Sequence, residues 1–252
     1  MKLGFIGAGN MASALARGIG EPALVFDVDA DRAQALAGAL GGEAVASNSE
    51  LAERADAVVL CHKPPQLAEV AEQARGARAV VSILAAVTIE RLEDAYPDAS
   101  VYRFIPNLPA EVRKGVLCYV PGARAAEGPE AELLDLFGRV GAVIALDSEP
   151  LIEPAMALMS CGPAFMALVA ESFAEAGAGH GLPPDEAVRM TVEAMAGTAA
   201  WLREHDYDTA DIRARVATPG GTTEQGLIRL EESGLRDACR AAVDAVVEAT
   251  RR

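Results

Sequence analysis

A glycine turn near the N-terminus limits the fold of this chain more than any other feature. Gly7-Ala8-Gly9-Asn10-Met11-Ala12 follows the apolar run Lys2–Ile6, which predicts a buried strand, and it opens a helical pattern. Gly7 allows a tight turn, Gly9 lets the backbone approach a ligand, and Ala12 permits close helix–strand packing. Strand, glycine turn and helix in this order predict a site for the pyrophosphate of a dinucleotide.

The end of the second predicted strand bears on which dinucleotide binds. Ala23–Asp27 ends in a carboxylate, which is expected to accept hydrogen bonds from the adenosine ribose and to repel a 2′-phosphate. Asp29 adds negative charge, and Arg32 partly offsets it. The sequence therefore favours NADH and leaves NADPH open as the cofactor.

Residues 1–147 alternate short β-rich runs with helical patterns. The predicted strands are Lys2–Ile6, Ala23–Asp27, Ala57–Cys61, Ala79–Leu84, Val101–Ile105, Val116–Val120 and Val143–Leu146. The predicted helices are Met11–Ile19, Asp31–Leu40, Ser49–Arg54, Gln66–Gln73, Ile89–Tyr96 and Glu130–Arg139. Continuously apolar strands such as Ala57–Cys61 are typical of a parallel sheet covered by helices on both faces. The pattern predicts a Rossmann-like, doubly wound α/β domain over residues 1–147.

Residues 148–252 show helical patterns only. The predicted helices are Leu151–Ala178, Pro184–Glu204, Thr209–Val216, Thr222–Glu232 and Leu235–Arg251. Several are apolar around much of their circumference, with more Met and Phe than one buried stripe requires. We therefore expect an all-α domain that forms a homodimer through these helices, and a higher oligomer of dimers stays open.

Composition narrows the range of partners and compartments. The net charge is −15 and no Lys/Arg run occurs, so we expect neither a nucleic-acid nor an anionic-membrane partner. The 4 cysteines are far apart and lack metal-ligand spacing, so we expect no metal. No signal peptide is evident, and no apolar run approaches the roughly 20 residues of a membrane span. These features predict a cytoplasmic protein.

A second glycine turn lies near the C-terminus. Thr218-Pro219-Gly220-Gly221-Thr222-Thr223 is predicted to turn directly into a helix. The free N–H groups and partial positive charge of a helix N-terminus suit a small carboxylate. A dinucleotide site and a small-anion site in one chain predict a reductase.

The chain resembles a known protein family over essentially its whole length. The segments that carry the resemblance are Gly4-Phe5-Ile6-Gly7-Ala8-Gly9-Asn10-Met11, Lys63-Pro64, Arg103-Phe104-Ile105-Pro106-Asn107-Leu108-Pro109, Cys161-Gly162-Pro163-Ala164-Phe165 and Val216-Ala217-Thr218-Pro219-Gly220-Gly221-Thr222-Thr223. Together they resemble the pyrroline-5-carboxylate reductases, which catalyse the last step of proline biosynthesis with NAD(P)H.

The resemblance implies roles for particular residues. The implied cofactor-binding residues are Ile6, Gly7, Ala8, Gly9, Asn10, Met11, Asn48, Cys61, His62, Lys63 and Pro64, with Ile83, Leu84 and Ala85 near the nicotinamide. The implied substrate-binding residues are Gly220, Gly221, Thr222, Thr223 and Glu149. The Thr223 hydroxyl would contact the ring nitrogen and is the candidate catalytic group, although an ordinary first-turn threonine is the alternative.

Several positions depart from the family pattern, at Cys161, Leu108, Thr218 and Asp206. Because these lie in segments expected to face the pocket, reduction of another cyclic imine on the same fold stays open. A catalytically silent, dinucleotide-binding relative is a further alternative, which the retained Pro-Gly-Gly-Thr-Thr turn argues against. A packing or rim role for His62, and a packing thiol for Cys161, are simpler interpretations than a part in the chemistry.

Overall fold

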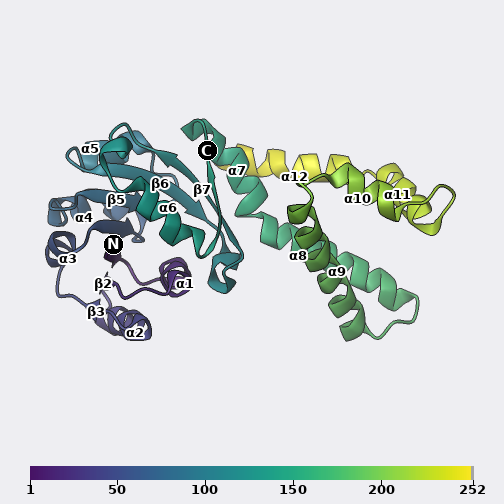
Figure 1. Ribbon diagram of the computed structural model, residues 1–252, viewed down its shortest axis with the longest axis horizontal. Coiled ribbons are helices and arrows are strands. Elements are labelled where there is room, and N and C mark those ends of the chain that lie inside the picture. Colours follow the sequence, from purple (N-terminus) through teal and green to yellow (C-terminus); the bar gives the residue numbers. More distant parts are fainter. Residues whose placement is uncertain (251–252) are drawn as a thin grey trace. The chain divides into compact units, whose positions relative to one another are not determined.

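The computed structural model describes residues 1–250 and divides into two compact units, Met1–Ser160 and Cys161–Ala249 (Figure 1). The first unit contains every strand that the structure describes, and the second is helical. The fold class predicted from the sequence, a Rossmann-like domain followed by an all-α domain, is confirmed. The predicted boundary at residue 147 stays a prediction.

The first unit is built on one sheet with the strand order β3-β2-β1-β4-β5-β6-β7-β8. Its strands are β1 (Leu3–Ile6), β2 (Leu24–Phe26), β3 (Glu43–Ala44), β4 (Ala57–Leu60), β5 (Ala79–Ser82), β6 (Ser100–Pro106), β7 (Gly115–Pro121) and β8 (Gly141–Ala145). The chain runs outward from β1 to β3, returns to β4 beside β1, and then continues outward on the other side. The strand order therefore reverses between β1 and β4, where doubly wound folds bind their ligands.

Two features of the sheet differ from the sequence expectation. β7 is antiparallel to β6, although every other neighbouring pair is parallel. The connection over residues 107–114 contains only a short 3₁₀ turn, η2 (Leu108–Val112), and a parallel crossover needs about a dozen residues or more. The strand β3 was not predicted, because two residues are too few to show the alternating pattern of a strand. It is recognised only by its pairing with β2.

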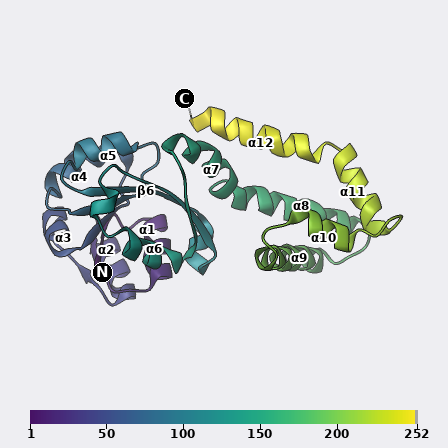
Figure 2. The same ribbon diagram turned by 45° about the horizontal axis from the view of Figure 1, so that its top comes forward.

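Helices cover both faces of the sheet, as Figure 2 shows. They are α1 (Asn10–Ile19), α2 (Ala30–Leu40), α3 (Asn48–Arg54), α4 (Leu67–Gln73), α5 (Ile89–Ala95) and α6 (Glu130–Gly138), with the 3₁₀ turns η1 (Pro64–Gln66) and η3 (Ala125–Glu127). One core cluster lies under α1, α2 and α6, and another lies under α3, α4 and α5. Local caps explain several helix starts: Asp29, Ser47 and Thr88 each accept a hydrogen bond from a first-turn N–H.

The long helix predicted over Leu151–Ala178 is interrupted. The structure has η4 (Glu149–Leu151), α7 (Ile152–Met159) and α8 (Gly162–Gly179), with a break at Ser160 and Cys161. Pro163 lies in the first turn of α8 and has no N–H to donate to the Met159 carbonyl four residues earlier. That carbonyl accepts instead from Asn107 Nδ2 at 2.8 Å. The proline and the asparagine together account for the break.

The remaining helices follow the prediction closely. They are α9 (Pro184–Glu204), α10 (Thr209–Val216), α11 (Thr222–Glu232) and α12 (Leu235–Thr250). The first three have the predicted bounds, and α8 packs against α9 (Figures 1 and 2). The last residue predicted for α12, Arg251, lies outside the described residues.

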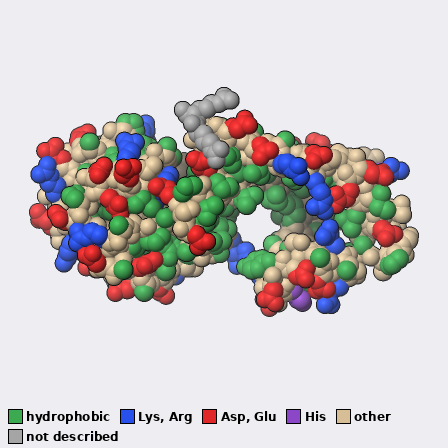
Figure 3. Space-filling model, turned by 90° about the horizontal axis from the view of Figure 1, so that it is seen from above, with side chains coloured by type: hydrophobic (Ala, Val, Ile, Leu, Met, Phe, Trp, Pro, Cys, Tyr) green, Lys and Arg blue, Asp and Glu red, His purple; other side chains and the backbone are tan. Residues whose placement is uncertain are grey.

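The helical unit leaves large apolar side chains at its surface. Those more than two-fifths exposed include Met166, Leu168, Phe173, Val188, Met190, Val192, Val216 and Ile228. Figure 3 shows hydrophobic side chains at the surface among charged ones. The expectation that no stretch approaches a membrane span is wrong: Glu149–Gly179 is long and apolar enough by length and composition alone, although the helix is broken at Ser160 and Cys161. Most of this segment is exposed in the single chain.

Candidate functional site

The turn between β1 and α1 is shaped by Gly7. Its N–H donates to the Phe26 carbonyl at 2.8 Å, and its φ of +104° is a conformation that L side chains rarely adopt. A Cβ at this position would lie 2.8 Å from the carbonyl carbon and oxygen of Cys61. The turn therefore requires glycine for two independent reasons.

Gly9 has the opposite surroundings. It is the N-cap residue of α1, it has an ordinary φ of −72°, and a Cβ there would meet nothing within 4 Å. No side chain caps the helix, so the first N–H groups of α1 have no side-chain acceptor. An uncapped helix N-terminus beside open space is suited to a phosphate group.

A cavity of about 370 Å³ adjoins this turn. Its lining residues are Ile6, Gly7, Gly9, Phe26, Asp27, Val28, Arg32, Asn48, Cys61, His62, Lys63, Gln66 and Val70. They come from the ends of β1, β2 and β4 and from the segments that follow, where the strand order reverses. Eight of the predicted cofactor residues thus surround one cavity, and Arg32 joins them.

Two buried polar atoms at this cavity lack partners among the described residues. Asn48 is 4% exposed; its Nδ2 donates to Gln73 Oε1 at 2.7 Å, and its Oδ1 has no hydrogen bond. His62 Nδ1 lies 3.0 Å from the Lys63 carbonyl, which only accepts, so neutral His62 carries its proton on Nδ1. Its Nε2 is then a buried, unpartnered acceptor. Because buried polar groups are nearly always hydrogen-bonded, both atoms fit a polar ligand such as a dinucleotide.

Burial also changes the acid–base properties of this segment. It lowers the pKa of His62, although the hydrogen bond to Lys63 acts in the opposite direction. Burial raises the pKa of the Cys61 thiol, which keeps this cysteine protonated and unreactive at neutral pH. His62 and Cys61 are therefore neutral groups beside the cavity.

Asp27 has a second role that sequence reasoning missed. Its Oδ2 accepts from the Ala8 N–H at 2.6 Å, and its Oδ1 accepts from the Asp29 N–H at 2.8 Å. The carboxylate therefore joins the end of β2 to the glycine turn, in addition to lining the cavity. Arg32 Nε pairs with Asp29 at 3.2 Å across exposed side chains, so its guanidinium is held weakly.

The other predicted cofactor residues do not line the cavity. Ala8 is buried, Asn10 is exposed, and Met11 packs on the core. Pro64 begins η1. After β5, Leu84 is buried in the core whereas Ala85 is exposed.

The C-terminal glycine turn lies in the helical unit and begins α11. Gly220 has φ +76° but open space around its Cβ position, so its conformation, and not a clash, requires glycine. A Cβ on Gly221 would lie 2.5 Å from Thr218 Oγ1. The side chains of Thr222 and Thr223 are exposed in the first turn of the helix.

One N–H of this turn already has an acidic partner. Glu224 Oε2 accepts from the Gly220 N–H at 2.7 Å. The expectation of a fully free set of N–H groups is therefore wrong for Gly220. The Gly221 N–H donates to the Thr218 carbonyl at 2.9 Å. The first-turn N–H groups of Thr222, Thr223 and Glu224 are the ones left without a helical acceptor, because α11 starts there.

Glu149 is occupied by contacts within the first unit. Its Oε1 accepts from the Ile89 N–H at 2.8 Å and forms a short ion pair with Arg103 Nη1. Arg103 comes from a segment that carries the family resemblance, yet sequence reasoning gave it no role. Its partner lies 46 residues away, so no local pattern could have shown it.

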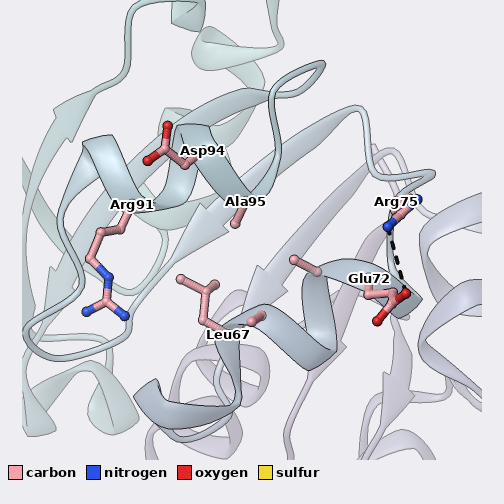
Figure 4. Close-up of a pocket in the computed structure, with 8 residues that line it drawn as sticks. Leu67, Glu72, Arg75, Arg91, Asp94 and Ala95 are labelled. Carbon is pink, nitrogen blue, oxygen red and sulfur yellow. Dashed lines mark ion pairs between the residues drawn. The ribbon is translucent and has the colours of Figure 1, made fainter.

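A larger hollow, of about 490 Å³, lies away from this site, between α4 and α5 (Figure 4). It is lined by Leu67, Ala68, Ala71, Glu72, Arg75, Arg91, Asp94 and Ala95. Its charged side chains are of both signs, and none of the predicted site residues lines it. Size alone therefore does not mark the functional site.

Two family models match the chain. The one described as "NADP oxidoreductase coenzyme F420-dependent" matches residues 2–86, and the one described as "Pyrroline-5-carboxylate reductase dimerisation" matches residues 149–252. The doubly wound fold, the cavity at its strand reversal and the first match define the class: an oxidoreductase that uses a nicotinamide dinucleotide.

Individual relatives narrow the class further. Pyrroline-5-carboxylate reductase 3 of Danio rerio is 34% identical over 100% of this chain and 91% of its own length. The solved structure of a pyrroline-5-carboxylate reductase from Coxiella burnetii is 29% identical, with TM-score 0.92 over 99% of this chain and 97% of that one. A Plasmodium falciparum pyrroline carboxylate reductase with NADP bound is 25% identical, with TM-score 0.83 over 99% and 97%. The chain belongs to the pyrroline-5-carboxylate reductase family.

Proposed function

We propose that this chain reduces the C=N bond of 1-pyrroline-5-carboxylate to give L-proline, using NADH or NADPH. The observation that carries the proposal is the presence, in one chain, of the cavity at the Gly7–Ala12 turn and the Pro-Gly-Gly-Thr-Thr turn before α11. The first suits a dinucleotide, and the second suits a small carboxylate. The test is steady-state oxidation of NADH and of NADPH with 1-pyrroline-5-carboxylate, with proline identified as the product.

The residues of the chain have limited chemistry to perform. The bound dinucleotide supplies the hydride, which adds to the imine carbon while the ring nitrogen gains a proton. The N–H groups at the start of α11 hold the substrate carboxylate, and the Thr223 hydroxyl hydrogen-bonds the ring nitrogen. Threonine is a poor acid, so the proton originates from solvent. Alignment of donor and acceptor is then the main contribution of the protein.

The cofactor preference is proposed from the charges around the cavity. Asp27 lies where the adenosine ribose is expected, and its negative charge opposes a 2′-phosphate. Arg32 also lines the cavity and attracts a 2′-phosphate, but it pairs with Asp29. We therefore propose that NADH is used at least as well as NADPH.

A second candidate is reduction of a different cyclic imine. It is favoured by the departures from the family pattern at Leu108, Cys161, Asp206 and Thr218. Leu108 is 62% exposed, so it is free of core packing that would otherwise dictate its identity. Assays with pyrroline-2-carboxylate and with six-membered cyclic imino acids, beside 1-pyrroline-5-carboxylate, decide between the two candidates by the ratio of kcat/KM values.

The working form is proposed to be a cytoplasmic homodimer joined through the helices of residues 148–252. The match of the dimerisation family model to residues 149–252 and the exposed apolar side chains of α8 and α9 support the dimer. Sedimentation measurements would show whether dimers assemble into a higher oligomer.

A further inference from the structure

We propose that Arg103 and Glu149 are positioning residues that hold the loop after β5, residues 83–88, and thereby set the affinity for the reduced dinucleotide. This inference rests on one part of the proposed function, namely that a nicotinamide dinucleotide binds next to this loop. It gives Glu149 a role in cofactor binding instead of the contact with substrate that the family resemblance implied.

The far end of the loop is held by Glu149. Ile89 is the first residue of α5, and its N–H has no acceptor within the helix. Glu149 Oε1 takes that N–H at 2.8 Å, and a carboxylate at a helix N-terminus is also favoured by the helix dipole. The bond joins residues 60 apart in sequence, so it ties the loop to the segment that follows β8.

Arg103 holds Glu149 in that position. The Arg103 side chain is 8% exposed and the Glu149 side chain is 27% exposed, so their ion pair is largely shielded from water. Arg103 Nε is buried and has no hydrogen-bond partner among the described residues. Glu149 is therefore the group that neutralises this guanidinium, and the guanidinium fixes which way the carboxylate points.

The near end of the loop has its own anchors. Ser82 Oγ accepts from the Leu84 N–H at 3.2 Å, and the Ile83 N–H donates to the Leu60 carbonyl at 3.2 Å. Arg103 lies opposite Ser82 in the β5–β6 register. The residue that anchors the near end of the loop and the arginine that holds Glu149 at its far end are therefore neighbours across two paired strands. Between them Ala86 has φ +57°, in the left-handed region. A strained, exposed tip held at both ends needs both anchors to keep one conformation.

The place of the loop in the sheet connects it to the cofactor. It follows β5 at the carboxyl end, next to the segment that follows β4, and that segment contributes Cys61, His62 and Lys63 to the cavity. Ligands of doubly wound sheets bind beyond these carboxyl ends. Loss of the hydrogen bond between Glu149 and the Ile89 N–H would let the loop change conformation at the carboxyl ends of the strands, where the dinucleotide is expected to bind.

The experiment compares Glu149→Ala, Arg103→Met, the double variant and the conservative Arg103→Lys. Leu133→Ala, a truncation in the core under α6, is the control for general destabilisation. The dissociation constant for NADH is measured by fluorescence without imine, and the Michaelis constant for the imine substrate is measured at saturating NADH. Hydrogen exchange of residues 83–92 reports the loop directly.

We expect Glu149→Ala and Arg103→Met each to weaken NADH binding about tenfold, the scale of one lost hydrogen bond with its charge. The Michaelis constant for the imine should change less than about twofold, exchange should rise over residues 83–92, and Arg103→Lys should restore most of the affinity. Because Arg103 acts through Glu149, the double variant should bind no worse than the poorer single variant. It also removes both charges, so it folds even if an unpaired Arg103 prevents folding of Glu149→Ala.

A rise in the Michaelis constant for the imine with unchanged NADH affinity would return Glu149 to the substrate pocket and overturn the proposal. The proposal would also be overturned if the single variants weakened NADH binding no more than Leu133→Ala does. Losses of NADH affinity that add up in the double variant would overturn it as well. NADH binding is measured without imine, so a wild-type protein that binds NADH but leaves 1-pyrroline-5-carboxylate unreduced contradicts the proposed function alone.

Discussion

At the scale of single residues, Gly7 and Gly9 are expected to respond differently to the same substitution. Gly7→Ala places a Cβ 2.8 Å from the Cys61 backbone at φ +104°, so it should cost about 1–3 kcal/mol of folding free energy as well as cofactor affinity. Gly9→Ala meets nothing in the protein within 4 Å, so it should lose only the small N-cap preference of glycine over alanine while the Cβ occupies space left for the pyrophosphate. Chemical denaturation and NADH titration separate the two effects. Equal stability loss in both variants would contradict this account.

Asp27 governs the choice between cofactors in our proposal. Asp27→Ser should shift the ratio of kcat/KM values toward NADPH by about 1–2 kcal/mol, or roughly 5- to 30-fold, because a like charge beside the 2′-phosphate is removed. The variant also loses the hydrogen bond to the Ala8 N–H, so both cofactors should bind more weakly. The ratio isolates the charge effect, and Asp27→Asn, which keeps an acceptor, is the matched control. Strong NADPH preference in the wild type would instead point to Arg32.

His62 should make stability depend on pH in a defined direction. Burial lowers its pKa below the ordinary value of 6.5, so on acidification the unfolded chain takes up this proton before the folded one does. The contribution of His62 to stability is therefore complete above pH 6.5 and is lost as pH falls toward the lowered pKa. Between about pH 7.5 and pH 5, the wild type should lose more unfolding free energy than His62→Asn. Parallel curves for the two proteins would show that His62 does not titrate differently on folding.

At the scale of elements, the start of α11 combines a glycine with positive φ, a crowded glycine and two exposed threonines. Gly221→Ala should raise the Michaelis constant for the imine strongly and leave NADH binding nearly unchanged, because its Cβ would lie 2.5 Å from Thr218 Oγ1 and displace the turn. Gly226→Ala, in the same helix with nothing within 4 Å of the new Cβ, is the matched control and should leave that constant unchanged.

Thr223→Ala tests the hydroxyl at the same helix start. We expect kcat/KM to fall by about 10- to 100-fold, the effect of one lost hydrogen bond to a group whose charge changes in the reaction. Thr223→Ser keeps the hydroxyl and should retain most of the activity. Full activity in Thr223→Ala would place the nitrogen contact on another group or on water.

At the scale of the whole molecule, the apolar surface of the helical unit predicts the assembly. The full chain and residues 149–252 expressed alone should sediment as dimers, whereas residues 1–147 should be monomeric. The interface should exceed the standard size of about 1,600 Å². Phe173→Glu, at a side chain 51% exposed on α8, should shift the full chain toward monomer. Val112→Glu, at a side chain 69% exposed in the first unit, is the control and should leave the dimer intact.

Local signals in the sequence predicted much of this protein. The bounds of α9, α10 and α11 were predicted correctly because their start and stop signals, such as Pro184 and the Asp208 cap, lie within a few residues of the helix ends. The glycine turn at Gly7 was identified for a similar reason, since its strand, turn and helix are contiguous. The fold class followed from the order of such elements.

The tertiary structure decided what depends on partners distant in sequence. The Asp27 carboxylate binds the Ala8 N–H 19 residues away, and Glu149 binds Arg103 and the Ile89 N–H across 46 and 60 residues. The two-residue strand β3 exists only through its pairing with β2. Helix periods, caps and glycine turns depend on residues that are close in sequence, so the sequence determined the elements and their order. Hydrogen bonds between elements depend on how the chain packs, so only the folded structure determined that Arg32 and Gln66 join the cavity lining and which polar side chains hold one element to another.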